Sequence, residues 1–257
     1  MHRFFVSPEC LRDGRVSLTG SLGRQLSRVL RLRPSDRIVL LDDSGWAYEV
    51  ELDRVTRGLA TGHIVGAWEP RTEPSARLVL YQALPKRRRF DWILQKGTEL
   101  GVSTFVPILT ERCVGGRGER GDDHRLARWR RIVSEAAEQS GRAHLPRVLQ
   151  VTPFAEACEA PPSDALALMA SVGGEAVPLS EALRSLEDAA QPREDAAPHL
   201  REVRLYVGPE GGFAPREVAL AREAGIVPVS LGPRILRTET AGLVALSAVL
   251  YALGDMG

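Results

Sequence analysis

Hydrophobic and polar positions alternate over short runs in the first 68 residues, which is typical of β-strands. The runs Arg37–Leu41 and Trp46–Leu52 flank Asp42–Gly45, whose composition is typical of a hairpin turn. Gly62–Trp68 has the pattern of a further strand, whereas Ser21–Leu30 has a helical spacing. The apolar residues of this helical stretch are Leu22, Leu26, Val29 and Leu30. The pattern predicts a small β-barrel interrupted by one helix, with all four of these residues on the inner face.

The pattern changes after Glu69–Ser75, a polar stretch punctuated by prolines that we interpret as a domain boundary. From Arg77 onward, apolar runs of strand length alternate with amphipathic helical stretches, which favours a mostly parallel α/β sheet. We therefore expect an N-terminal domain over residues 1–70 and an α/β domain over 77–257. The expected strands are Leu78–Gln82, Thr104–Leu109, Ala165–Met169 and Val203–Val207, and the expected helices include Arg87–Leu100, Arg125–Ser140 and one starting at Pro215.

The last predicted helix, Thr238 to Leu253, is apolar on nearly all sides. Its leucines form a stripe, and valines and alanines cover the other faces. Such a helix must be buried, either in the core of its own domain or against a second subunit.

Composition excludes several classes of protein. The 257 residues are 44% hydrophobic and 26% charged, as expected of a globular protein, and no apolar run is long enough for a membrane span. The first residues lack a signal-peptide core, and the three cysteines are best explained as reduced thiols, so we expect a cytoplasmic protein. The five histidines have no metal-ligand spacing, and we assign no metal. The net charge of +1 means that nucleic-acid binding requires local basic patches.

Two glycine-rich segments near the C-terminus carry the candidate chemistry. Gly208–Gly212 follows an apolar run and precedes Pro215, and Leu231–Thr240 repeats the arrangement about twenty residues later. Each cluster alone could be an ordinary turn. Together they favour a pocket in which backbone N–H groups and helix N-termini hold a polar ligand. Neither of these two segments has the spacing of the dinucleotide fingerprint, and the chain contains no P-loop motif, which disfavours an oxidoreductase of that type and a P-loop NTPase.

Basic residues cluster in both predicted domains. Lys86–Arg89 is a dense basic run, and further arginines lie on and after the N-terminal helix. A solvated helix surface explains each cluster separately. Their recurrence makes an RNA-facing surface the sharper interpretation.

With these segments in view, the chain resembles the bacterial ribosomal RNA small-subunit methyltransferase E family of the SPOUT superfamily. The likeness covers nearly the whole length. Its motifs are Arg28–Leu32, Gln95–Val102, Glu135–Arg142, Gly208–Phe213 and Leu231–Ala241. The chain departs from the family pattern at Gly97, where alanine is usual, and at Gln25 and Leu26, where a histidine pair is frequent.

The resemblance implies a PUA-like β-barrel followed by a SPOUT α/β domain with a deep trefoil knot, and a homodimer. It also implies methyl transfer from S-adenosylmethionine to N3 of a uridine in the 16S RNA of the small ribosomal subunit. Three segments would hold the donor: the end of the strand Leu166–Ala170, the loop Gly208–Gly212 and the segment Leu231–Leu236. Ile235 and Leu236 would line the apolar side of its adenine. The donor-binding residues carried over are Leu168, Met169, Ala170, Val207, Gly208, Pro209, Gly211, Gly212, Leu231, Gly232, Ile235, Leu236 and Thr238.

Three side chains are candidates for the chemistry. Uridine N3 is a poor nucleophile until it loses its proton, and Arg237 would stabilise the resulting charge on the uracil oxygens. Glu210 and Glu239 are the carboxylates of the two segments, and either could accept the proton, cap a helix or bind backbone N–H groups. The candidates for RNA binding are Arg28, Arg31, Lys86, Arg88 and Arg142. The open alternatives are a SPOUT enzyme with another RNA target and a non-catalytic RNA-binding protein.

Overall fold

The computed structural model describes residues 1–86, 89–113, 123–173, 176–190 and 202–256. The chain forms two compact units, each with its own sheet. The first comprises Met1–Glu73 together with Ala137–Leu145, and the second comprises Pro74–Ala136 and Pro146–Gly257. The last residues of a helix from the middle of the chain therefore belong to the N-terminal unit. Arg88, a candidate for RNA binding, lies outside the described residues.

The N-terminal unit is a mixed six-stranded sheet in the order β1-β4-β5-β6-β3-β2. Its strands are β1 (His2–Phe5), β2 (Leu11–Arg12), β3 (Arg15–Thr19), β4 (Arg37–Leu41), β5 (Ala47–Thr56) and β6 (Leu59–Trp68), and a short 3-10 helix, η1 (Pro8–Cys10), precedes β2. The predicted hairpin is confirmed, because β4 and β5 pair antiparallel from Leu41 opposite Ala47. The predicted barrel is not found: β1 and β2 stand at opposite ends of the strand order, and no pairing joins them within the described residues.

The N-terminal helix differs from its prediction in its second half. It consists of α1 (Gly20–Arg24) and a π-helical segment, η2 (Gln25–Val29), in which the Leu30 N–H donates to the Gln25 carbonyl at 3.0 Å. Leu26 is fully buried as predicted, but Val29 is 72% exposed. A π-turn contains more residues than an α-turn, so it rotates every later side chain away from the face expected for an α-helix.

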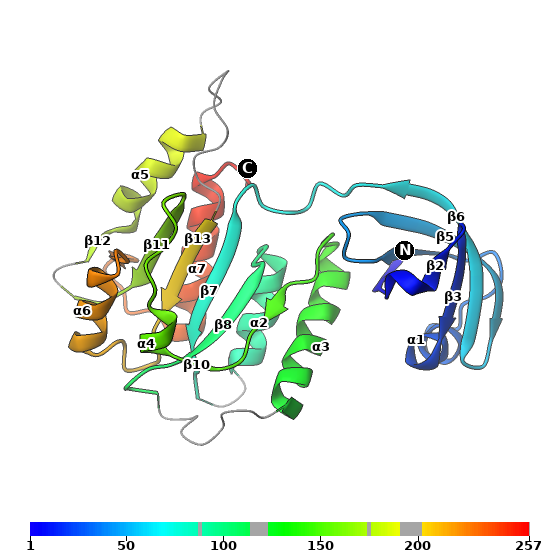
Figure 1. The fold of residues 1–257 in the computed structure, drawn as a ribbon, viewed down its shortest axis with the longest axis horizontal. Coiled ribbons are helices and arrows are strands. Elements are labelled where there is room, and N and C mark those ends of the chain that lie inside the picture. Colours follow the sequence, from blue (N-terminus) through cyan, green and yellow to red (C-terminus); the bar gives the residue numbers. More distant parts are fainter. Residues whose placement is uncertain (87–88, 114–122, 174–175, 191–201, 257) are drawn as a thin grey trace. The chain divides into compact units, whose positions relative to one another are not determined.

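The second unit contains an all-parallel sheet in the order β10-β8-β7-β13-β11-β14-β12, with β9 also paired to β8 (Figure 1). Its strands are β7 (Arg77–Ala83), β8 (Thr104–Leu109), β9 (Arg147–Val148), β10 (Thr152–Pro153), β11 (Ala165–Ala170), β12 (Val177–Pro178), β13 (Glu202–Val207) and β14 (Val227–Ser230). The predicted parallel sheet is therefore confirmed. Its central strands are nearly continuous apolar runs because both faces are covered.

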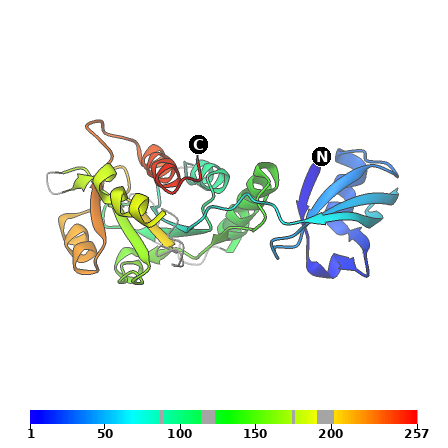
Figure 2. The ribbon, with the colours of Figure 1, turned by 90° about the horizontal axis from the view of Figure 1, so that it is seen from above.

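Helices cover this sheet on both faces. They are α2 (Arg89–Glu99), α3 (Asp123–Ser140), α4 (Phe154–Ala157), α5 (Leu179–Ala190), α6 (Pro215–Glu223) and α7 (Thr238–Ala252). Figure 2 shows α2 and α7 on one face and α4 and α6 on the other. The predicted burial of the last helix is confirmed for the inner face of α7, where Ala245, Leu246 and Val249 are at most 2% exposed. Its outer side leaves Val244 and Tyr251 exposed.

Candidate functional site

The three segments predicted to form one pocket follow three adjacent strands. β11 lies between β13 and β14, and Ala170 at its end is level with Val207 on one side and Val229 on the other. Parallel strands place their carboxyl ends at the same edge of a sheet, and ligands of open α/β sheets bind outside that edge. The loops 208–214 and 231–237 therefore start at the same edge of the sheet, on either side of the end of β11.

The loop after β13 is held rigidly. Gly212 has a left-handed φ of +66° and donates its N–H to the Pro209 carbonyl at 2.9 Å. Ala214 has no side chain that could cap the start of α6, and the buried Glu217 carboxylate takes over this task. It accepts from the Ala214 N–H and from the Glu111 N–H, both at 2.8 Å. The loop thus presents fixed backbone groups at the edge of the sheet.

The loop after β14 offers both apolar and polar surface. Gly232 has a φ of +103°, and a Cβ there would meet no atom within 4 Å, so the backbone is open on this side. Ile235 is 83% exposed, which is unusual for a large aliphatic side chain. Leu231 and Leu236 beside it are half-buried. An exposed apolar side chain next to an open backbone suits a flat heterocycle with polar edges.

A buried hydroxyl joins the two loops directly. Thr238, the first residue of α7, donates its hydroxyl to the Gly208 carbonyl at 2.5 Å and accepts from Gln82 Nε2 at 3.0 Å. Because this hydroxyl has a single proton, which Gly208 takes, it cannot donate a hydrogen bond to a ligand. The predicted donor-binding residues Leu168, Met169 and Val207 are also buried, at 1% exposure or less, and their side chains belong to the core. Ala170, Gly211, Gly212 and Gly232 remain at the accessible edge.

An arginine that the sequence analysis did not single out lies at the centre of the site. Arg89, at the start of α2, contacts Glu210 Oε1 through Nη1 at 3.1 Å and Glu239 Oε1 through Nε at 3.6 Å. The Lys86 N–H donates to the same Glu210 oxygen at 3.1 Å. Both carboxylates considered as proton acceptors are therefore partners of one guanidinium. The only sequence signal was the basic run itself, which does not disclose these partners.

Arg237 has the opposite environment. It precedes α7 in an extended conformation (φ −67°, ψ 153°), and its side chain is exposed. It forms no ion pair with any described residue. A free guanidinium beside the two loops is available to an anion.

The candidates for RNA binding fall into two groups. Arg28, Arg31 and Lys86 are exposed, and Arg31 has a left-handed φ of 55°, which is rare for a residue with a side chain. Arg142 is the exception: its side chain is 3% exposed and it is paired with Glu73 at 2.5 Å. The structure does not favour RNA contact by Arg142, because its guanidinium is buried against a carboxylate 69 positions away.

The Glu73 carboxylate shows how firmly Arg142 is held. Burial alone would raise the pKa of Glu73, but hydrogen bonds from Arg142 and from the N–H groups of Ala143 and His144 outweigh it and lower the pKa below its ordinary 4.5. Arg142 Nε reaches the two carboxylate oxygens at 3.0 and 2.9 Å. This pair fixes the end of α3 to the N-terminal unit.

Comparison with known proteins identifies the family. RNA methyltransferase domains as a family match residues 72–250, so the chain is an RNA methyltransferase by class. It is 36% identical to the ribosomal RNA small subunit methyltransferase E of Synechocystis, over 96% of this chain and 77% of that protein. It is 32% identical to the same enzyme of Bacillus subtilis, over 98% and 96% of the two chains. The chain belongs to the ribosomal RNA small subunit methyltransferase E family.

A solved structure extends the likeness to the whole fold. The ribosomal RNA small subunit methyltransferase E of Neisseria gonorrhoeae, bound to S-adenosyl methionine, is 35% identical, covers 100% of both chains and superposes with a TM-score of 0.84. In the described residues of the present chain, no helix combines the length and the hydropathy that a bilayer crossing requires.

Proposed function

We propose that this chain methylates N3 of a uridine in 16S ribosomal RNA, with S-adenosylmethionine as the methyl donor. The observation that carries the proposal is the convergence of the β11 end with the loops 208–214 and 231–237 at one sheet edge. Family membership supports the class of reaction, and the donor in the Neisseria structure supports the ligand. The cytoplasm, where ribosomes are modified, is the corresponding location.

The residues at the edge fit the donor. The exposed Ile235 and the half-buried Leu236 supply an apolar surface for an adenine, and the glycines let backbone groups approach closely. The donor, when bound, supplies a methyl group on a sulfonium leaving group. The chain has to align the two partners and stabilise the uracil that has lost its proton. Arg237 is suited to that charge because it has no carboxylate partner in the described residues.

The fold proposal is a SPOUT domain with a trefoil knot at its C-terminus. α7 contacts β11 and β13, and it also contacts α5, which lies in the connection between those two strands. Contact of the last helix with both the sheet and this connection is what a threaded C-terminus requires. For the N-terminal unit we propose a PUA-like fold that binds RNA, supported by its mixed sheet and by the exposed Arg28 and Arg31.

A homodimer is part of the proposal. Val244 and Tyr251 lie seven residues apart on α7, hence on one face, and are 41% and 73% exposed. Exposed apolar side chains in such an arrangement favour contact with a second copy of the helix. Sedimentation should give a dimer for the natural sequence and a monomer when both residues are replaced by aspartate. A wild-type monomer at micromolar concentration would contradict the dimer.

Methyl transfer tests the main proposal. Small subunits or 16S RNA lacking the modification are incubated with labelled S-adenosylmethionine, and the nucleosides are identified by mass spectrometry. N3-methyluridine is the expected product. A different methylated nucleoside would support another RNA target, and donor binding without transfer to any RNA would contradict the proposal.

A further inference from the structure

We propose that Arg89 is a positioning residue that ties the two loops of the donor site together, and that Glu210 and Glu239 are its anchors rather than general bases. The inference rests on the proposed function, because it concerns the same site. Glu210 lies in the loop after β13, and Glu239 is the second residue of α7, which follows the loop after β14. Arg89 comes from α2, 121 positions before Glu210, so three separate segments meet at one guanidinium.

One carboxylate oxygen of Glu210 is fully engaged by Arg89 and by the backbone of Lys86, as expected of an anchor. Its Oε1 atom accepts from Arg89 Nη1 and from the Lys86 N–H, each at 3.1 Å. A carboxylate oxygen has two lone pairs in its plane, and both are used by these donors. Hydrogen bonds from a cation and from a main-chain N–H are also a means of fixing a loop, because they define the position of the carboxylate.

Glu239 differs in burial but leads to the same conclusion. Its side chain is 14% exposed, and its Oε2 atom is buried without a hydrogen-bond partner in the described residues. An oxygen enclosed in this way is out of reach of an RNA base. A buried carboxylate requires a compensating cation, and Arg89 is the cation that contacts it.

Loss of Arg89 would therefore release two segments at once. The first turn of α7 would contain an uncompensated carboxylate directly after Thr238, whose hydroxyl holds Gly208, and two residues after Arg237. The loop after β13 would lose one of the two donors to Glu210. Both effects loosen the surface that receives the donor without removing a group that touches it.

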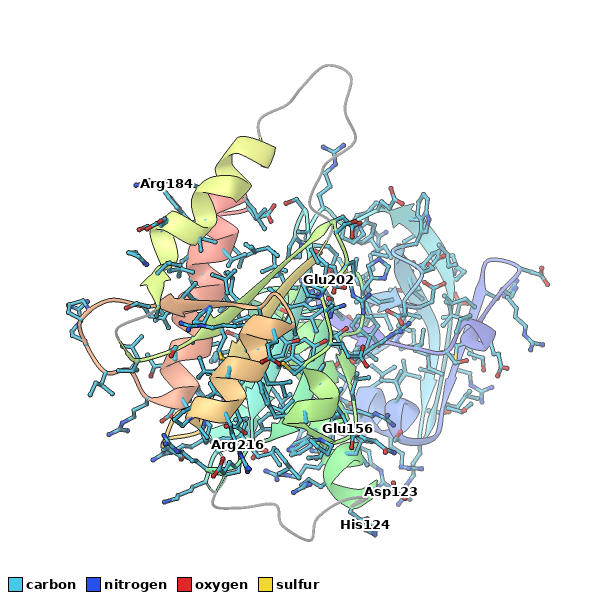
Figure 3. The ribbon with its side chains drawn as sticks, turned by 60° about the vertical axis from the view of Figure 1, so that its left-hand side comes forward. Asp123, His124, Glu156, Arg184, Glu202 and Arg216 are labelled. Atoms are coloured by element: carbon cyan, nitrogen blue, oxygen red, sulfur yellow. The ribbon has the colours of Figure 1, made fainter. Side chains whose placement is uncertain are left out.

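Calorimetric titration with S-adenosylmethionine tests the inference. Arg89→Ala should raise the Kd about 10-fold, and Arg89→Lys should raise it less, because an ammonium can pair with one carboxylate but lacks the two-sided fork. Adding Glu239→Gln to Arg89→Ala should give no further loss, because the unpaired charge is removed. The control is Arg184→Ala on α5, an exposed arginine of the same unit, which should leave the Kd unchanged (Figure 3).

Kinetics distinguish an anchor from a base. With saturating donor, Glu210→Gln and Glu239→Gln should retain kcat within about 5-fold and keep the pH profile, since a missing general base costs roughly 100-fold or more. The inference would be overturned if either variant lost kcat 100-fold at an unchanged Kd and also lost the acidic limb of its pH–rate profile. An unchanged Kd for Arg89→Ala would do so too. If Arg89→Ala does not fold, Arg89→Lys and the glutamine variants give the same comparison.

The proposed function can fail separately. If the natural sequence binds no S-adenosylmethionine, the donor assignment is wrong, and thermal unfolding of the single and double variants still measures the coupling of Arg89 with each glutamate. A coupling free energy of zero for both the Arg89–Glu210 and the Arg89–Glu239 pair would overturn the positioning role of Arg89. Binding of the donor with the wrong nucleoside as product would overturn only the target.

Discussion

Two arginine-bearing segments of the N-terminal unit differ in whether their arginines are buried in an ion pair. The segment directly after α3 carries Arg142, which is buried in an ion pair with Glu73. The η2 segment carries Arg28 and the following Arg31, both of which are exposed. Arg28, Arg31 and Arg142 were all predicted to contact RNA. The comparison teaches that the role of an arginine depends on whether a carboxylate lies within its reach.

The second unit contains the same contrast within one site. Arg89 holds two carboxylates, whereas Arg237 has no such partner in the described residues. An engaged arginine stabilises the protein, and a free one is available to a ligand. If this distinction is sound, substitutions at the two kinds of arginine should affect different measurable quantities.

The largest effect should come from the free arginine of the donor site. Arg237→Ala should lower kcat about 100- to 1000-fold at saturating donor, the usual consequence of removing a group that stabilises developing charge. The Kd for S-adenosylmethionine and the melting temperature should change little. Initial rates with 16S RNA or small subunits measure this. Wild-type turnover would exclude the role of Arg237 in stabilising charge, and Arg237→Lys should recover part of the rate.

The engaged arginine of the N-terminal unit should instead control stability. Glu73→Ala leaves Arg142 buried without its partner, and the free energy of unfolding should fall by about 3 kcal/mol. Urea denaturation measures the loss. The matched control is Glu135→Ala, which breaks the exposed pair with Arg131 and should cost far less, because water screens the two charges. Equal losses in the two variants would contradict the distinction between buried and exposed pairs.

The pH dependence sharpens the same test. The pKa of Glu73 is lowered in the folded state, so its contribution to stability is complete above its ordinary pKa of 4.5 and is lost as the pH falls through the lowered value. The difference in unfolding free energy between the wild type and Glu73→Gln should therefore be constant from pH 7 to about pH 5 and shrink in more acidic buffer. A difference that grows on acidification would have the wrong sign for this pair.

The sequence alone predicts the strands of this protein better than its ion pairs. The bounds of β4 and β8 agree with the prediction because each is a continuous apolar run between polar residues. Val29 was placed on the inner face because helical spacing assumes an α-helix, and the π-turn of η2 violates that assumption. Local periodicity is set by neighbours in the chain, so it predicts elements and fails where an element is irregular.

The candidate site was partly predictable for the same reason. The order of β13, β11 and β14 cannot be read from the chain, but parallel strands followed by glycine-rich loops indicated a common edge. The partners of Arg89 and Arg142 lie 121 and 69 positions away, and no spacing rule connects residues at such separations. Depth in the core was also hidden: Leu168 and Met169, which the family resemblance places at the donor, have fully buried side chains.

A smaller effect is expected for RNA affinity. Arg28→Ala and Arg31→Ala should each weaken binding and reduce the slope of log affinity against log salt by about 1, because each exposed cation neutralises about one phosphate. Filter binding or fluorescence anisotropy over a range of salt concentrations measures the slope. Arg37→Ala is the control, since Arg37 is also exposed but is paired with Glu49 and Glu51. A slope that changes for Arg37→Ala and not for Arg28→Ala would reverse the comparison.

The smallest expected effect is on stability, and it distinguishes the backbone strain at Arg31 from the role of its charge in RNA binding. A residue with a side chain at a φ of 55° loses roughly 1 kcal/mol relative to glycine in the same conformation. Arg31→Gly should therefore be about 0.5 to 1 kcal/mol more stable than Arg31→Ala, after allowance for the greater flexibility of glycine in the unfolded chain. Both variants lack the cation, so both should lose the same RNA affinity. If the glycine variant were no more stable than the alanine variant, the left-handed turn would not be strained. If the glycine variant kept wild-type RNA affinity, the guanidinium of Arg31 would not be a phosphate contact.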